Sequence, residues 1–175
     1  MSEDNRTQFK LRVWTRFFAP VEDVWRLKTD PKHLQAEFRP YFYLHVPDSK
    51  GLVEAFAAGA PGHFAGRLIP PGVSWPIELE AVERPGRYVD SSSNALFPLF
   101  QHEHTIQVTD EGCRYIDEVI FSTSLPGQKV VAIMLQRLFV HRHRVAARKL
   151  PTDLKATAVS VLRVHFDPSS KLVDD

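Results

Sequence analysis

Residues 100–121 read FQHEHTIQVTDEGCRYIDEVIF, and this stretch decides the fold. Apolar and polar residues alternate on both sides of Asp110-Glu111, which is the pattern of two β-strands joined by a tight hairpin. A two-residue loop at that point places His104 directly opposite Asp117 on one face. That face is otherwise largely apolar, so an imidazole and a carboxylate meeting on it indicate either a functional site or a buried polar pair.

A long helix follows the hairpin. From Gln128 to about Leu150, apolar residues recur at every third or fourth position, which is the period of an α-helix. Pro126-Gly127 precedes this segment and Pro151 ends it. At about 1.5 Å per residue, the helix is long enough to cross a small domain.

The half of the chain before the hairpin begins with a strand at residues 9–17, where polar and apolar positions alternate strictly. Pro20 then opens a short helix with acidic residues in its first turn, and Asp30 is placed to cap a second short helix. Residues 49–62 fit either a short helix or a mobile flap. Turn-forming residues separate four further predicted strands, at 41–46, 63–69, 73–82 and 88–92.

This order of elements predicts an α+β fold. We expect a curved antiparallel sheet of about six to seven strands wrapped around the long C-terminal helix, with two short helices after the first strand. The predicted domain spans residues 8–150. Residues 1–7 are expected to be disordered, and residues 151–175 form an extension in which an added strand is followed by a frayed tail.

Composition limits the function classes. The chain has 175 residues, of which 43% are hydrophobic and 25% charged, and its net charge is +1, so it does not have the strongly basic character of a nucleic-acid binder. Its single cysteine, Cys113, excludes an internal disulfide and a cysteine-built metal site. The polar first residues are unlike a signal peptide, and no apolar run is long enough to span a bilayer. We therefore expect a cytoplasmic protein with no nucleic-acid partner and no stable membrane insertion.

Four motifs, in this order, resemble a known superfamily. They are Ala19-Pro20 before an acidic helix, His102-Glu103-His104, the strand from Asp117 that leads to Pro126-Gly127, and Phe139 to His143 in the long helix. Together they are similar to the START, polyketide-cyclase and birch-allergen-like (SRPBCC) helix-grip superfamily, and to a bacterial branch with a His-x-His strand. The resemblance covers roughly residues 8–150.

The resemblance implies a cavity between sheet and helix that holds an apolar small molecule. Members of the superfamily bind lipids, sterols, polyketides, hormones or quinones, and some cyclise or dehydrate a polyketide. The expected partner is therefore a hydrophobic small molecule, with a homodimer left open. The predicted ligand-binding residues are Phe100, His102, Tyr115, Phe121, Trp75, Leu138, His141 and Arg142.

Arg142 has two interpretations. Its guanidinium could anchor a carboxylate or phosphate of the ligand, or it could be a cation that stabilises the negative end of the helix. The helical spacing places His141 on the inward side with Leu138, and it turns His143 and Arg144 away from the sheet.

Three chemical hypotheses compete for the His-x-His strand. His102 and His104 could share a metal ion with Asp117, but the sequence supplies no further ligand at suitable spacing, so no metal and no cofactor is predicted. Asp117 could orient His104 for acid–base chemistry, with Tyr115 as a proton donor, which would make His104 and Asp117 the catalytic pair. The preferred hypothesis is a polar pair in a binding protein that carries out no reaction. A polyketide cyclase or dehydratase is the alternative.

Overall fold

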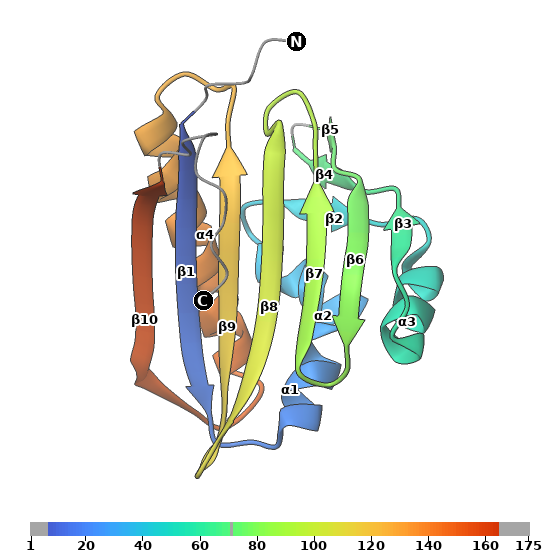
Figure 1. Ribbon diagram of the computed structural model, residues 1–175, viewed down its shortest axis with the longest axis vertical. Helices are drawn as coiled ribbons and strands as arrows, with labels where there is room; N and C mark the ends of the chain where they lie inside the picture. Colours follow the sequence, from blue (N-terminus) through green and yellow to red (C-terminus); the bar gives the residue numbers. More distant parts are fainter. Residues whose placement is uncertain (1–6, 71, 165–175) are drawn as a thin grey trace, which may run out of the picture.

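The computed structural model describes residues 7–70 and 72–164, with side chains up to Thr152 (Figure 1). Its helices are α1 (Val21–Lys28), α2 (Pro31–Phe38), α3 (Ser49–Ala58) and α4 (Gln128–Ala147). Its strands are β1 (Gln8–Phe17), β2 (Tyr43–His45), β3 (Gly62–Phe64), β4 (Arg67–Ile69), β5 (Val73–Ser74), β6 (Ile77–Glu83), β7 (Arg87–Ser92), β8 (Leu99–Thr109), β9 (Gly112–Ser122) and β10 (Thr152–Val164).

The main sheet is antiparallel and has seven strands in the order β10-β1-β9-β8-β7-β6-β3 among the described residues. Figure 1 shows α4 behind β10, β1 and β9, and α1 and α2 behind the middle of the sheet. A small sheet, β2-β4-β5, lies beside α2 on this same side. The predicted α+β helix-grip fold is confirmed.

The β8–β9 hairpin has the predicted register. Thr109 pairs with Gly112 across the two-residue loop, and His104 faces Asp117. Gly112 has a φ of 146°, and a Cβ atom there would lie 2.2 Å from the carbonyl oxygen of Phe17. Only glycine fits this close approach of β1 to the hairpin.

Local capping explains the two short helices on either side of β2. The Asp30 carboxylate accepts a hydrogen bond from the backbone N–H of Lys32 at 2.9 Å, which confirms the predicted cap of α2. Asp48 caps α3 in the same way, through the N–H of Gly51. Of the two alternatives for residues 49–62, the structure therefore has the helix over Ser49–Ala58.

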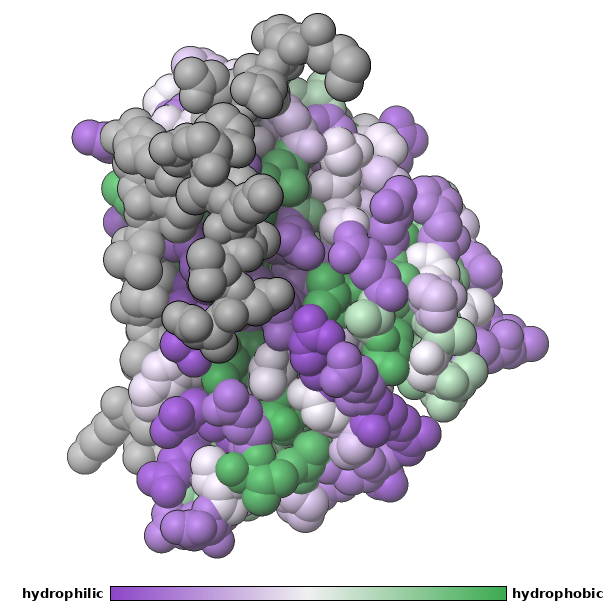
Figure 2. Space-filling model, in the orientation of Figure 1, coloured by the Kyte–Doolittle hydropathy of each residue, from purple (hydrophilic) through white to green (hydrophobic). Residues whose placement is uncertain are grey.

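The core has two parts. One lies beneath α1 and α3, and the other fills the space between α4 and strands β1, β8 and β9. In the second part the rings of Phe9 and Phe121 stack at 5.3 Å between centroids. Figure 2 shows the opposite face of the sheet, where hydrophilic residues are spread over the described surface and hydrophobic ones form small patches. Residues of α4 line both cavities described below, which therefore lie on the other side of the sheet.

The end of α4 and the strand after it differ in detail from expectation. The helix ends at Ala147, three residues before the predicted Leu150, and β10 then pairs along β1. The predicted disordered segment 1–7, except for Thr7, and the predicted frayed tail, Asp167 to Asp175, lie outside the described residues. None of the helices in the described part combines the length and apolar character that crossing a bilayer requires.

Candidate functional site

Two neighbouring cavities lie between the main sheet and α4. The smaller has a volume of about 140 Å³ and is enclosed by the main sheet, the small sheet and helices α2, α3 and α4. The larger, of about 500 Å³, lies toward the first turns of α4. Six side chains line both cavities and so form a shared wall: Phe42, Leu68, Trp75, Phe97, Leu135 and Leu138. The larger volume lies within the range of about 300–1,000 Å³ that is usual for small-molecule sites, and the smaller one is below it.

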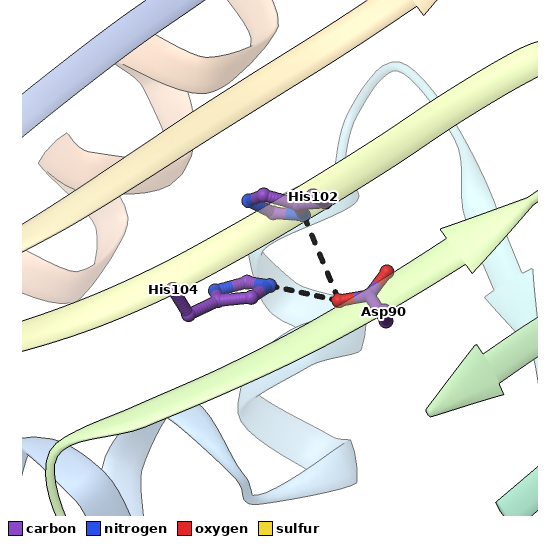
Figure 3. A group of neighbouring side chains, drawn as sticks. All are labelled: Asp90, His102 and His104. Carbon is purple, nitrogen blue, oxygen red and sulfur yellow. Dashed lines mark hydrogen bonds and ion pairs between the residues drawn. The ribbon is translucent and has the colours of Figure 1, made fainter. Parts of the chain in front are cut away.

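The smaller cavity is apolar except at one end. There Asp90 of β7 and the two histidines of β8 contribute to its lining, together with Lys28 and Arg142. Asp90 pairs with His102 in the β7–β8 register, and His104 follows two residues later on the same face. Figure 3 shows both imidazoles directed at one oxygen of Asp90. Its Oδ1 atom lies 2.9 Å from His104 Nε2 and 3.8 Å from His102 Nδ1.

Asp117 is the centre of the buried polar residues behind this end, and its side chain is fully buried. Its Oδ1 lies 3.0 Å from His104 Nδ1 and 3.1 Å from His102 Nε2. The same oxygen accepts a hydrogen bond from the Tyr115 hydroxyl, which lies 2.6 Å from His104 Nδ1. Its Oδ2 lies 3.1 Å from His143 Nε2. One carboxylate thus contacts three imidazoles and a phenol.

The burial of His143 was not predicted. The helical spacing turned it away from the sheet, but the structure buries it against Asp117 and places its Nδ1 atom 2.8 Å from Thr15 Oγ1. The expectation was wrong because α4 packs against β1 on one side and α2 on another, so neighbouring positions of the helix are both buried. Arg144 is exposed, as expected.

A second polar cluster surrounds Glu37 of α2, and we call it the Glu37 cluster. Oε1 of the Glu37 carboxylate accepts a hydrogen bond from Lys28 Nζ of α1 and lies 3.0 Å from His33 Nε2. Oε2 accepts a 3.0 Å hydrogen bond from Arg142 Nε of α4. All four side chains are buried. Arg142 also lies over the ring of Phe139. The cluster ties three helices together and brings two cations to the cavity wall.

The two buried carboxylates remain ionised for the same reason. Burial alone would raise the pKa of Asp117, but the neighbouring His102 and His104 imidazoles hold it well below its usual range. Burial would likewise raise the pKa of Glu37, and the Lys28 and Arg142 cations lower it instead. Stability from such groups is present above their ordinary pKa values and is lost as the pH falls toward the lowered ones.

His102 gives a pH dependence at milder acidity. Burial, together with the nearby His104, lowers the pKa of His102 from 6.5 to about 4. Between these values the unfolded chain binds a proton that the folded chain does not. The free energy of unfolding should therefore fall as the pH decreases through this window, by up to about 1.4 kcal/mol per pH unit for one proton. Urea unfolding of wild type and His102→Gln from pH 7 to pH 4 measures this slope, which should be shallower in the variant; equal slopes would contradict the assignment.

The predicted ligand-binding residues fall into two groups. Phe100, His102, Trp75, Leu138 and Arg142 line at least one cavity. The other three line neither: Tyr115 and Phe121 are buried behind the walls, and His141 contacts the Arg39 carbonyl and the ring of Tyr41.

Sequence reasoning did not identify four polar residues of the site: Lys28, His33, Glu37 and Asp90. Glu37 and Lys28 lie on short amphipathic helices, where charged residues usually face solvent. Asp90 occupies a strand at the position opposite His102. Correct pairing of β7 with β8 would have revealed it, but the sequence between these strands contains no short turn that fixes their register.

A family model described as a domain of unknown function, DUF8410, matches residues 15–150. The chain belongs to the DUF8410 family. No curated protein matches it by sequence. The matched segment includes every residue of the two polar clusters.

Solved structures resemble this DUF8410 chain in fold. Protein Ms6760 from Mycobacterium smegmatis is 18% identical over 81% of this chain and 90% of its own length, with a TM-score of 0.57. CV1439 from Chromobacterium violaceum is 14% identical over 82% and 99%, with a TM-score of 0.59. Ara h 8.0201 is 11% identical over 81% and 97%, with a TM-score of 0.56. At these identities the likeness establishes the helix-grip fold alone.

Proposed function

We propose that this protein binds a hydrophobic small molecule, such as a lipid, polyketide or quinone, in the two cavities between the main sheet and α4. The observation that carries the proposal is the arrangement of the lining, which is apolar along both cavities and polar at one end of the smaller. A lining of this kind is typical of ligand sites, in which hydrophobic walls bind and a few polar groups orient the ligand.

The dimensions also support a ligand with an apolar body and a small polar head. A dry cavity of about 150 Å³ holds a molecule the size of benzene. The smaller cavity, at about 140 Å³, therefore matches a head or ring, and the adjoining space of about 500 Å³ matches a longer apolar part. The polar head would meet the end formed by Asp90, His102 and Arg142.

Filling the shared wall tests this function. Leu135 is half-buried and lines both cavities, so Leu135→Trp should weaken binding of the apolar fluorophore 8-anilinonaphthalene-1-sulfonate at least about tenfold, a loss of about 1.4 kcal/mol. Fluorescence titration measures the dissociation constant. The matched control is Ile133→Trp, on the same helix but 49% exposed and outside both linings. Equal affinities of the two variants would refute binding in these cavities.

One observation favours a cyclase or dehydratase as a second candidate. His104 lines the smaller cavity and is hydrogen-bonded to Tyr115, whose hydroxyl in turn donates to Asp117. Such a chain could orient His104 to remove a proton next to a carbonyl group of a bound polyketide. His104→Ala separates the candidates: turnover of a polyketide substrate that collapses while its affinity survives would contradict a role in binding alone.

A further inference from the structure

We propose that Asp90, His102 and His104 form a binding site for a divalent transition-metal ion that opens into the smaller cavity. The three side chains come from the paired strands β7 and β8, and each offers one ligand atom within 4.8 Å of the others. Figure 3 shows the two imidazoles side by side and turned toward the same Asp90 oxygen. The sequence had suggested Asp117 as the third ligand, but that residue lies at the opposite nitrogens of both rings.

The spacing of the ligand atoms agrees with a tetrahedral ion. With metal–ligand bonds of about 2.0–2.1 Å, two donors of a tetrahedral site stand about 3.3 Å apart. The separations of Asp90 Oδ1 from His104 Nε2 and His102 Nδ1 are 2.9 and 3.8 Å, which lie on either side of that value. The third separation, between the two imidazole nitrogens, is within 4.8 Å, so rotation of the side chains would have to draw these donors together around one ion.

The hydrogen bonds of His104 at Nδ1 leave its other ring nitrogen, Nε2, able to bind a cation. The Tyr115 hydroxyl donates its proton to Asp117, so the phenol oxygen accepts a hydrogen bond from His104 Nδ1–H. In the tautomer with its proton on Nδ1, the imidazole presents the lone pair of Nε2 to the Asp90 carboxylate at 2.9 Å. Two electron-rich atoms at that distance repel each other unless a proton or a metal ion lies between them.

His102 has contacts to both carboxylates but no well-aligned hydrogen bond at Nε2. Its side chain is 5% exposed, Nδ1 lies 3.8 Å from Asp90 Oδ1, and the 3.1 Å contact of Nε2 with Asp117 Oδ1 does not have the geometry of a hydrogen bond. An ion bound at Nδ1 would place the imidazole proton on Nε2, and a small rotation would align this Nε2–H with Asp117. Histidine ligands usually donate their second N–H to a carboxylate in this way.

The local charge also favours a cation. Asp90 and Asp117 supply two negative charges next to the imidazoles, whereas the nearby Lys28 and Arg142 are both held by Glu37. With neutral imidazoles this end of the cavity is therefore net negative. The Asp90 side chain is 21% exposed and lines the smaller cavity, so its carboxylate faces the space that an ion would occupy.

The donor set indicates the class of ion. Two imidazole nitrogens and one carboxylate oxygen suit Zn²⁺, Co²⁺, Fe²⁺ or Cu²⁺ better than Mg²⁺ or Ca²⁺, which prefer oxygen ligands. Three protein ligands leave a position toward the cavity. If the protein binds an apolar ligand as proposed above, an oxygen atom of its head would occupy that position; this last step alone rests on the proposed function.

Metal titration of tag-free, EDTA-dialysed protein tests the site. Wild type should bind one equivalent of Co²⁺, with the visible absorption of a low-coordinate ion, and Zn²⁺ should displace it. Asp90→Asn and His102→Gln should each weaken Zn²⁺ binding in calorimetry by at least about 100-fold, beyond the usual effect of losing an outer partner. The matched control is His63→Gln, which removes an exposed histidine that lies 3.6 Å from Glu78 on neighbouring strands; it should change the affinity less than about twofold.

Two results would overturn the metal site. One is the absence of stoichiometric Co²⁺ binding by wild type, a result that does not depend on the folding of any variant. The other is equal Zn²⁺ affinity of His63→Gln and the two ligand variants. Titration of the EDTA-treated protein with 8-anilinonaphthalene-1-sulfonate distinguishes failure of the metal site from failure of the proposed function. If the protein binds the fluorophore but no metal ion, only the metal site is refuted. If it binds the metal ion but not the fluorophore, only the binding of an apolar ligand is refuted.

Discussion

Glu37→Gln should lower the free energy of unfolding by about 3–5 kcal/mol at pH 7, because it removes the only carboxylate from a buried cluster with two cations. In the wild type, Lys28 Nζ and Arg142 Nε both contact this carboxylate, and all three side chains are at most 3% exposed. The glutamine side chain has no charge, and its amide group presents N–H donors to a site that needs acceptors. Urea unfolding followed by circular dichroism measures the loss.

The matched control for this change is Glu54→Gln. Glu54 also pairs with a lysine on a helix, Lys50 at 3.6 Å, but its side chain is 67% exposed. Because exposed ion pairs contribute little, the control should lose less than about 1 kcal/mol. A loss of similar size in both variants would show that the buried Glu37 cluster does not hold α1, α2 and α4 together.

Asp117→Asn should have a comparably large effect, again about 3–5 kcal/mol. The carboxylate is fully buried and faces His102, His104 and His143, with the Tyr115 hydroxyl as a fourth partner. Asparagine keeps one acceptor oxygen but turns an NH₂ group toward at least one donor, and it removes the charge that these groups surround. Thermal and urea unfolding give the size of the loss.

Glu118→Gln is the control for this second change. Glu118 is the next residue of β9 and lies on the opposite face of the sheet, where it is 29% exposed and 3.3 Å from Arg12. Loss of this partly exposed pair should cost less than about 1 kcal/mol. If Asp117→Asn were as mild as Glu118→Gln, the imidazoles would not depend on Asp117 for their arrangement.

The hairpin shows how far local sequence reaches. The alternation in residues 100–121 and the two-residue turn at Asp110-Glu111 predicted the pairing of His104 with Asp117, and the structure has that pairing. A short turn fixes register, because slipping by one residue would turn every apolar side chain to the wrong face. The cap of α2 at Asp30 was predictable for a similar reason, since its partner, Lys32, is only two residues away.

The partners of the site residues were harder to predict. Arg142 lines the smaller cavity, and its contact with Glu37 joins residues that are 105 positions apart. The contact of His143 with Thr15 spans 128 positions. No pattern within one helix or strand predicts contacts between residues so far apart in the sequence. The spacing of apolar residues in α4 gave the wrong orientation for His143, because the helix is covered on more than one side.

The sequence by itself determined most elements and the β8–β9 register, since alternation, helical period, turns and caps act over a few residues. The predicted single strands 63–69 and 73–82 were wrong, because each is two strands that belong to different sheets. Only the tertiary structure decided that Asp90 joins the two histidines, that His143 is buried and that Glu37 neutralises Arg142. These contacts depend on which strands become neighbours and on how α4 lies across the sheet. Packing of the whole chain determines the strand neighbours and the position of α4, because burial of apolar surface stabilises the global arrangement and leaves no pattern in the local sequence.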